Sequence, residues 1–303
     1  FLYDIMIKQD KGIKKENDSI GLLPEESVVM AKFMESFLKW NTPLWRKKND
    51  YLKEKEKNAP NPKIWAHRGC SMQYPENTIP AFIAAAKIPG ITGIELDVQF
   101  TKDKQVVVFH DENVGRVTNG NKNVCEYTLK ELKELKVCNE DITIPTLQEV
   151  LTSLKPYCEN NGLLINIELK TSIIRYEGIE QETHNIVKNN GMEKYIVYSS
   201  FLPESVAMMK EIAPECESGM LAVSIEDCIN MARQTNADAL HPYLGGMTCE
   251  IPQDMKYMPV RGWNGEEPFY KDGRELKDIH LDRFKAYGVT DIITNVPKIY
   301  LQN

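Results

Sequence analysis

The chain has 303 residues, of which 42% are hydrophobic and 27% are charged, a balance typical of a globular protein that buries a sizeable core. Its net charge of −7 argues against a nucleic-acid-binding surface, which is usually basic. No apolar run approaches the length of a membrane span, and the seven cysteines include no CxxC pair, so neither a disulfide framework nor a thiolate zinc site is predicted.

The sequence begins with Phe1-Leu2-Tyr3 and has no initiator methionine. One interpretation is that a signal or anchor segment precedes it, which would make the protein extracytoplasmic or membrane-anchored. The alternative is a trimmed sequence from a cytoplasmic protein. Both localisations stay open.

Residues 1–60 are predicted to form an N-terminal helical extension. Within residues 25–57, apolar residues recur at helical spacing until Thr42-Pro43 interrupts them, and the part that follows is strongly basic. We favour a helix packed on the main domain, and the alternative is peripheral contact of residues 25–57 with a membrane. A Pro-rich stretch then ends the segment. The apolar residues are Val29, Phe33, Phe37 and Leu38.

Residues 61–303 alternate short apolar segments with helical ones. This pattern predicts an α/β fold of the (β/α)8 TIM-barrel type. An open doubly wound sheet is the rival, but no Gly-rich dinucleotide loop follows the first strand. The predicted strands are residues 63–67, 93–98, 106–110, 163–169, 195–200, 218–222, 237–241, 259–263 and 291–295, and the predicted helices are residues 78–87, 146–155, 179–190, 203–212, 225–235 and 281–288.

The predicted strands are one more than a barrel needs. The stretch between Asp97 and Val106 is too short for a parallel crossover, which takes a dozen or more residues. We therefore expect the second and third strands to form a hairpin that turns at residues 101–104. Such a hairpin would bring His110 back to the level of Glu95 and Asp97.

Ionisable residues stand at the ends of the first four predicted strands. In a barrel enzyme the carboxyl ends of the strands carry the active site, so these side chains are expected to converge there. They are His67 and Arg68, Glu95 and Asp97, His110, and Glu168 and Lys170.

Three of these residues predict a metal site. Glu95 and Asp97 are two apart on a strand, so they share one face, and Glu168 ends a neighbouring segment of the same kind. Three carboxylates this close repel one another, and burying them unpaired is expensive. A single divalent cation would resolve this, and oxygen ligands favour Mg²⁺ or Ca²⁺ over zinc. The alternative is a structural ion pair between Glu168 and Lys170.

The other residues predict proton transfer and anion binding. Imidazole titrates near neutrality, so His67 and His110 could exchange protons with a substrate. Arg68 offers a planar fork of donors for phosphate oxygens, and Lys170 adds a point charge. His184 and His280 are interpreted as structural histidines, and His241 keeps a smaller chance of lining the site.

The ordered set of motifs resembles the glycerophosphodiester phosphodiesterase family, a group of TIM-barrel phosphodiesterases related to phosphatidylinositol-specific phospholipase C. The resemblance covers about four-fifths of the chain. It implies a barrel that hydrolyses glycerophosphodiesters to glycerol 3-phosphate and an alcohol, with a bound Mg²⁺ or Ca²⁺. The motifs are HRG, PENT, ELDV, TxD, VVxFHD, IPTLxEVL, IxIELK, SSF, a late Trp and GVxxIIT.

The resemblance also implies roles for single residues. His67 and His110 match the acid–base pair, and Arg68 and Lys170 match the phosphate-contacting cations. The residues that match the metal ligands are Glu95, Asp97 and Glu168. In PENT, Glu76 and Asn77 border the site, where Glu76 contacts the metal or braces its ligands, or the motif simply starts a helix. Residues 111–145 match a small insertion, expected to be a lid over the substrate.

The late part of the chain departs from the family pattern. Trp263-Asn264-Gly265-Glu266 replaces a WTxN-like stretch, and residues 292–295 read IITN where the family has IITD. These departures bear on the alcohol pocket, for which Trp263 is the predicted contact. Phe201 and Tyr243 are further candidates, and the alternative is that these aromatic residues belong to the core. Two rival functions stay open, a lysophospholipase-D-type enzyme acting on lysolipids and a non-catalytic binding module for phospholipid head groups. The sequence leaves the oligomeric state undetermined.

Overall fold

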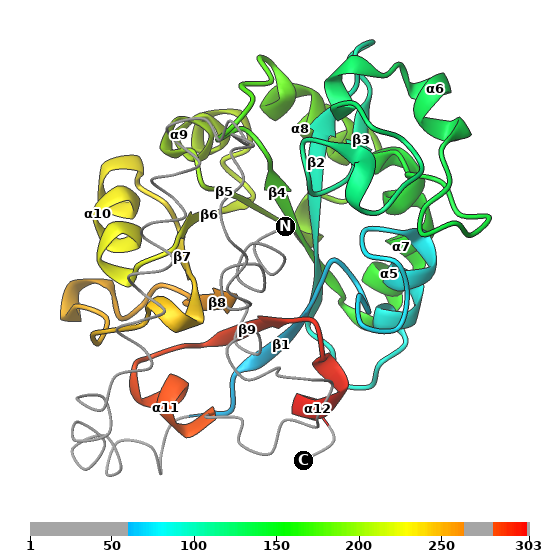
Figure 1. Ribbon diagram of the computed structural model, residues 1–303. Coiled ribbons are helices and arrows are strands. Elements are labelled where there is room, and N and C mark those ends of the chain that lie inside the picture. Colours follow the sequence, from blue (N-terminus) through cyan, green and yellow to red (C-terminus); the bar gives the residue numbers. More distant parts are fainter. Residues whose placement is uncertain (1–59, 264–280, 302–303) are drawn as a thin grey trace, which may run out of the picture.

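The computed structural model describes residues 60–263 and 281–301 of the chain. In this part, eight parallel strands are arranged in a ring and helices surround the ring (Figure 1). The strands are β1 (Lys63–His67), β2 (Gly93–Phe100), β3 (Val106–Val108), β4 (Leu164–Leu169), β5 (Ile196–Ser200), β6 (Glu217–Ala222), β7 (Ala239–Pro242), β8 (Arg261–Trp263) and β9 (Asp291–Thr294). The helices are α5 (Ile79–Ala86), α6 (Leu129–Glu134), α7 (Leu147–Asn161), α8 (Ile179–Asn189), α9 (Pro203–Ile212), α10 (Ile225–Thr235), α11 (Leu281–Ala286) and α12 (Pro297–Leu301).

The strand order makes the sheet a nearly closed barrel. Hydrogen-bonded neighbours run β7-β6-β5-β4-β2-β1-β9-β8. The two ends of this path meet through isolated parallel bridges, Leu240 with Val260 and Tyr243 with Trp263. The predicted (β/α)8 class is therefore confirmed.

β3 is the strand that the eight-stranded barrel does not include. β3 pairs antiparallel with β2, with Val98 opposite Val108 and Phe100 opposite Val106. The predicted hairpin is confirmed, and Lys104 takes a left-handed φ of 60° in its turn. The strand ends at Val108, two residues earlier than predicted, so His110 lies in the bend that follows. The backbone N–H of Phe109 still donates to the carbonyl of Asp97 at 3.0 Å, which keeps this bend at the end of β2.

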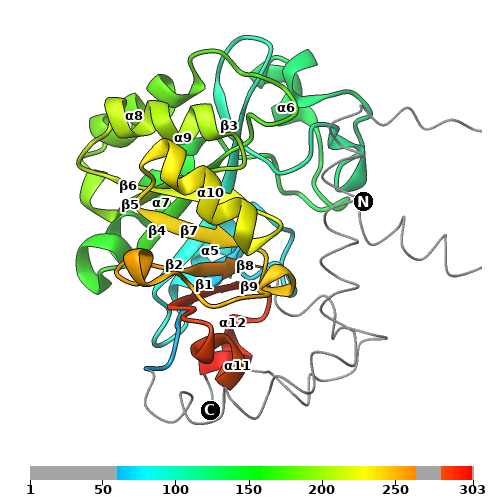
Figure 2. The ribbon, with the colours of Figure 1, turned by 90° about the vertical axis from the view of Figure 1, so that its left-hand side faces the viewer.

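The helices begin at residues that cap them. The Thr78 hydroxyl accepts from a backbone N–H in the first turn of α5. Thr146 and Glu149 form a capping box at the start of α7. This helix continues past Pro156, beyond its predicted end, and stops where Gly162 adopts a φ of 69°. In the perpendicular view α9 and α10 lie in front of the strands (Figure 2). α9 packs against β5 and β6, and α10 packs against β6 and β7.

Packing on both sides of the strands explains why the polar residues point inward. On β2, Ile94, Leu96 and Val98 are fully buried in the apolar layer shared with the helices. Inside the barrel, Gly93 leaves room for the ring of Trp65, which a Cβ at that position would meet. Side chains therefore fill the interior of the barrel, and the residues that can reach a substrate are confined to its ends.

Residues 111–145 leave the barrel after β3 and form a small unit with its own core. The unit contains α6 and a 3₁₀ turn, Val114–Arg116. In Figure 1 it lies to one side of the ring, next to β3. Its role as a lid stays a prediction. The buried residues of its core are Val107, Phe109, Val114, Val124, Tyr127, Leu132, Val137 and Ile144.

Several predictions concern residues outside the described ranges. The N-terminal helical extension, the membrane contact of residues 25–57, the departure at residues 264–266 and His280 all fall there. Among the described residues, none of the helices combines the length and the apolar character that crossing a membrane requires.

Candidate active site

The site begins where β1 ends. His67 is the last residue of β1, and Arg68 takes a left-handed φ of 55°, an uncommon conformation for a side chain of this size. The backbone N–H of Arg68 donates to Glu95 Oε2 at 3.1 Å, and its carbonyl accepts from the Asn77 N–H at 3.1 Å. The strained backbone thus turns the chain back over β2 and holds PENT against the strand end.

Three carboxylates meet where β2 passes the carboxyl ends of β1 and β4. β2 itself continues to Phe100, two residues beyond its predicted end. Asp97 stands opposite Glu168 in the register of these strands, and Glu95 lies two residues before Asp97. One oxygen of each carboxylate lies within 4.8 Å of the others. All three residues are buried, Asp97 completely. The predicted cluster of Glu95, Asp97 and Glu168 is therefore present in the geometry.

The cluster holds oxygens that the described protein leaves without hydrogen bonds. Glu95 Oε1 and Asp97 Oδ1 are buried and have no such partner among the described residues. Burial and the neighbouring charges of Asp97 and Glu168 raise the pKa of Glu95 well above its usual range. Buried acceptors without donors are costly, and an all-oxygen set suits a hard divalent cation. The residues therefore fit the predicted Mg²⁺ or Ca²⁺.

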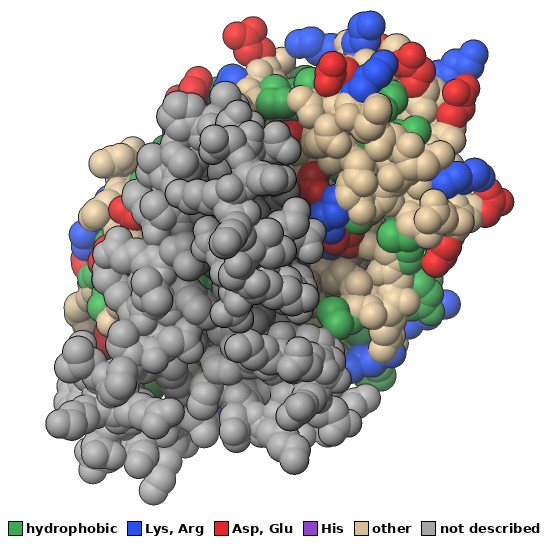
Figure 3. Space-filling model, viewed as in Figure 1, with side chains coloured by type: hydrophobic (Ala, Val, Ile, Leu, Met, Phe, Trp, Pro, Cys, Tyr) green, Lys and Arg blue, Asp and Glu red, His purple; other side chains and the backbone are tan. Residues whose placement is uncertain are grey.

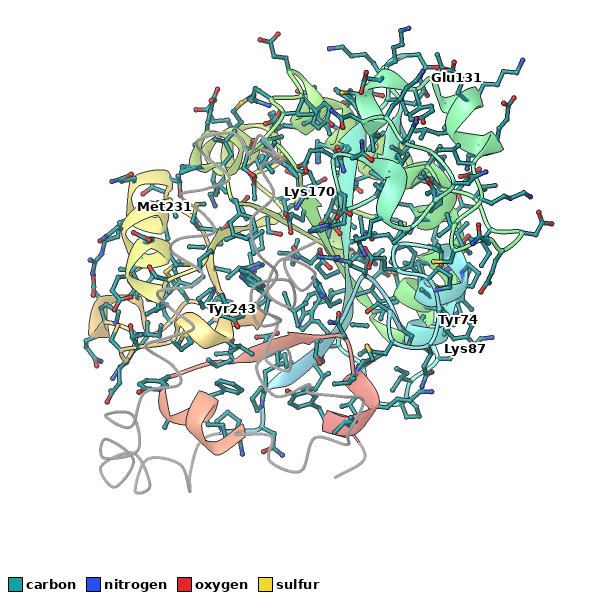
Figure 4. All side chains as sticks on the ribbon, viewed as in Figure 1. Tyr74, Lys87, Glu131, Lys170, Met231 and Tyr243 are labelled. Atoms are coloured by element: carbon teal, nitrogen blue, oxygen red, sulfur yellow. The ribbon has the colours of Figure 1, made fainter. Side chains whose placement is uncertain are left out.

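Two cations border the cluster. Lys170 Nζ donates to Glu168 Oε1 at 3.0 Å and lies 3.9 Å from Asp97 Oδ1. Arg68 Nε lies 3.5 Å from Asp97 Oδ2. Figure 4 shows Lys170 near the middle of the ring, at the end of β4, whereas Glu131 lies out on the insertion helix α6. In the space-filling view, acidic and basic side chains meet near the middle of the same face (Figure 3).

Each predicted acid–base histidine is held through its Nδ1 atom. His67 Nδ1 lies 2.7 Å from the amide oxygen of Asn295, which can only accept, so Nδ1 carries the proton. His110 Nδ1 lies 2.6 Å from Asp111 Oδ1, which has the same consequence. Asn295 is therefore the partner of His67 at the position where the family pattern has Asp.

Both Nε2 atoms turn toward the charged groups of the site. His67 Nε2 lies 3.8 Å from Glu95 Oε2, and His110 Nε2 lies 3.3 Å from Lys170 Nζ. Burial and the positive charge of Arg68 lower the pKa of His67 to about 3. Burial, Arg68 and Lys170 lower the pKa of His110 to about 4. Both imidazoles are thus neutral at pH 7, and the Nε2 lone pair of His110 accepts from Lys170 Nζ.

The insertion supplies residues that sequence reasoning missed. Arg116 Nη1 and Nη2 donate to Glu76 at 3.1 and 2.5 Å, and its Nε donates to Asp111 at 2.5 Å. Arg68 donates to the same Glu76 at 3.0 Å. Glu76 therefore braces two arginines and is not a member of the carboxylate cluster. Asp111 belongs to the VVxFHD motif, whereas no motif or spacing in the sequence predicted a role for Arg116.

Aromatic residues form another part of the same barrel end. Trp263 Nε1 donates to the carbonyl of His241 at 3.0 Å. Its ring lies 5.7 Å from that of Phe201 and 5.1 Å from that of Tyr243. These residues stand at or just after the ends of β8, β5 and β7. His241 itself is fully buried inside the barrel beside Arg261, and Trp263 as a substrate contact stays a prediction.

Comparisons with known proteins agree with the barrel fold. A family model described as the glycerophosphoryl diester phosphodiesterase family matches residues 67–298. The chain is 36% identical to a glycerophosphodiester phosphodiesterase of Caldanaerobacter subterraneus over 78% of its own length and 94% of that protein. It is 38% identical to one of Bacillus altitudinis, over 78% and 95% of the two chains. Its fold also resembles that of an Oleispira antarctica phosphodiesterase solved with its product, sn-glycerol-3-phosphate, at 24% identity and a TM-score of 0.63, covering 80% and 96% of the two chains.

Proposed function

Because this chain belongs to the glycerophosphoryl diester phosphodiesterase family, we propose that it hydrolyses glycerophosphodiesters to sn-glycerol 3-phosphate and an alcohol. One observation carries this proposal. Two neutral imidazoles and two cations gather around a buried three-carboxylate cluster at the carboxyl ends of the barrel strands. The product bound in the Oleispira antarctica relative supports the same product here.

The carboxylates would hold one divalent cation. Glu95, Asp97 and Glu168 supply only oxygen donors, which favours Mg²⁺ or Ca²⁺. When bound, the ion supplies a positive charge that polarises the phosphoryl oxygens. The hydrogen bond from Asn77 Nδ2 to Asp97 Oδ2, at 2.8 Å, fixes the orientation of one of these carboxylates.

Arg68 and Lys170 would bind the phosphodiester anion. Both approach the cluster from its rim and are already charged, so they need no rearrangement as charge develops on the phosphorus oxygens. The guanidinium is anchored to Glu76, which limits the positions that it can take. An anion placed between these cations would also favour protonation of the two imidazoles.

The histidines would move the protons. One Nε2 takes a proton from the nucleophile, either water or the glycerol 2-hydroxyl, as its oxygen bonds to phosphorus. The other imidazole, in its protonated form, gives a proton to the alcohol oxygen as the P–O bond to the alcohol breaks. If the 2-hydroxyl attacks, a cyclic phosphate forms first. Water then opens it with the roles of the histidines reversed: the now neutral one takes the proton from water, and the protonated one returns a proton to the 2-oxygen.

The test is release of glycerol 3-phosphate from glycerophosphocholine, before and after chelation, with Mg²⁺ and then Ca²⁺ added back. We expect release that stops on chelation and returns with one ion. The matched control is the Asp97→Asn variant, in which added metal should restore little activity although the protein stays folded.

Other outcomes would redirect the proposal. Turnover of lysophosphatidylcholine but not of glycerophosphocholine would identify a lysophospholipase-D-type enzyme. Binding of glycerophosphocholine without turnover under either ion would identify a head-group binding module. Release that persists in full after exhaustive chelation would contradict the role given to the carboxylate cluster.

A further inference from the structure

A second group of potential metal ligands lies away from the candidate active site. His184, Glu215 and Cys216 each place one ligand atom within 4.8 Å of the others. His184 belongs to α8, and the other two residues directly precede β6, which begins at Glu217. They therefore stand at the amino end of that strand, whereas the candidate active site occupies the carboxyl ends.

The imidazole of His184 is oriented by a buried tyrosine. Its Nδ1 lies 3.2 Å from the hydroxyl of Tyr198, and its Nε2 lies 3.3 Å from Glu215 Oε1. Tyr198 is almost fully buried on β5. With Nδ1 engaged by this hydroxyl, Nε2 is the nitrogen that faces Glu215. Metal-binding histidines are commonly held through their second nitrogen in this way.

The thiol of Cys216 lacks a strong partner of its own. It is buried and donates weakly to the carbonyl of Glu193 at 3.4 Å. Burial and the carboxylates of Glu215 and Glu193 raise the pKa of the thiol to about 12. A thiolate is the form that binds a metal, so a bound cation would take the place of the thiol proton.

We propose that His184, Glu215 and Cys216 bind a zinc ion that ties α8 to the start of β6. One nitrogen, one oxygen and one sulfur donor form a set that selects a borderline-soft ion over Mg²⁺ or Ca²⁺. Glu215 is half-exposed, so water can complete a tetrahedral shell from that side. On binding, the thiol proton goes to solvent, and the carboxylate and thiolate together balance the charge of the ion. The position, at the amino end of the barrel, suits a stabilising role.

Co²⁺ provides the test, since a thiolate ligand gives bound Co²⁺ a charge-transfer absorption that an all-oxygen site cannot produce. The titration is made on the purified chain in excess Mg²⁺, which occupies the carboxylate cluster. We expect one equivalent of Co²⁺ to develop the band, and Zn²⁺ to displace it. Cys216→Ser should abolish the band. Cys228→Ser is the matched control, because Cys228 is equally buried but lies on α10.

Two milder variants and thermal unfolding complete the test. Tyr198→Phe removes only the hydroxyl that orients His184 and should weaken binding about 10- to 100-fold. Zn²⁺ at a hundredfold excess over its Kd should raise the Tm by on the order of 5 °C in the wild type and in Cys228→Ser, but not in Cys216→Ser. Cooperative unfolding of metal-free Cys216→Ser would show that this variant folds. A band that survives in Cys216→Ser, or no band in the wild type, would overturn the proposal.

Discussion

Both ends of the barrel bury carboxylates, but the two ends differ in whether the protein supplies hydrogen-bond donors to them. At the amino end, Asp291 Oδ1 accepts from Trp65 Nε1 at 2.7 Å and Oδ2 accepts from the Thr290 hydroxyl at 2.6 Å. Arg261 bonds to Glu217 and lies 3.7 Å from Asp291. At the carboxyl end, Glu95 Oε1 and Asp97 Oδ1 have no hydrogen-bond donor among the described residues.

This difference separates carboxylates whose oxygens are satisfied within the protein from carboxylates whose geometry fits a bound cation. Buried acceptors are almost always satisfied, so a pair left over at one strand end indicates a partner from outside the chain. The amino-end carboxylates obtain their donors from the protein itself. Substitutions at the two ends should therefore act on different measurements, activity at one end and stability at the other.

The largest expected effect concerns the two imidazoles at the carboxyl end. His67→Ala and His110→Ala should each lower kcat for glycerophosphocholine by about 10²–10⁴-fold, because each removes one proton transfer. An aryl glycerophosphodiester should rescue the variant that lacks the general acid, since its phenolate leaves without a proton. Steady-state kinetics on both substrates, with metal bound, would assign the two roles. Near-normal turnover by either variant would remove that histidine from the chemistry.

At the amino end the opposite pattern is expected. Asp291→Ala leaves Trp65 Nε1 without its acceptor and takes one carboxylate from buried Arg261, so it should lower the free energy of unfolding by about 3 kcal/mol. Urea denaturation measures this, and kcat should stay within a few-fold of the wild type. The control is Asp254→Ala, which breaks an exposed pair with Arg233 and should leave the urea midpoint nearly unchanged. If Asp291→Ala is as stable as the wild type but inactive, the amino end does not serve stability alone, and the proposed difference between the two ends is wrong.

Glu95→Gln tests the effects on activity and on stability in one variant. Losing a metal ligand should lower kcat/KM at least about 100-fold. The chelated variant should nevertheless unfold at a higher temperature than the chelated wild type. Burial and the nearby Asp97 and Glu168 disfavour the ionised Glu95, and the amide oxygen can still accept from the Arg68 N–H. Melting curves with and without metal measure the second effect. If Glu95→Gln lowers the Tm by the same amount with metal and after chelation, Glu95 is a structural residue.

Much of the fold was predictable because its signals are local. Alternating apolar runs and helical segments located the barrel strands, and the short link between Asp97 and Val106 indicated the hairpin. The ends of elements were less predictable. α7 continues through Pro156, a residue type that usually interrupts a helix, and ends only where Gly162 adopts a positive φ. The last ladder bond of β3 runs from the Phe109 N–H to the carbonyl of Asp97. The strand ends before His110 because the carbonyls that follow accept from the side chain of Gln99 instead of from a strand.

The carboxylate cluster was predictable from strand period, whereas its surroundings depend on distant parts of the chain. Glu95 and Asp97 share a face because they are two apart on a strand. The contact between His67 and Asn295 joins the first strand to the last, and no local pattern encodes it. Arg116 reaches Glu76 only because the insertion folds around its own core. Such contacts arise from tertiary packing.

The smallest expected effect concerns this link between the insertion and the barrel. Burial raises the pKa of Glu76, but Arg68 and Arg116 outweigh it and hold that pKa at about 2. A lowered folded-state pKa contributes stability that is complete above about pH 4.5 and is lost as the pH falls toward 2. Glu76→Gln should therefore cost roughly 2 kcal/mol at pH 7 and less at pH 3. Urea denaturation across this range measures the difference, with the exposed Glu204→Gln as control. If the loss of unfolding free energy in Glu76→Gln does not vary with pH, the packing of the Glu76 side chain matters and its charge does not. The insertion would then be held to the barrel by its apolar contacts with β3.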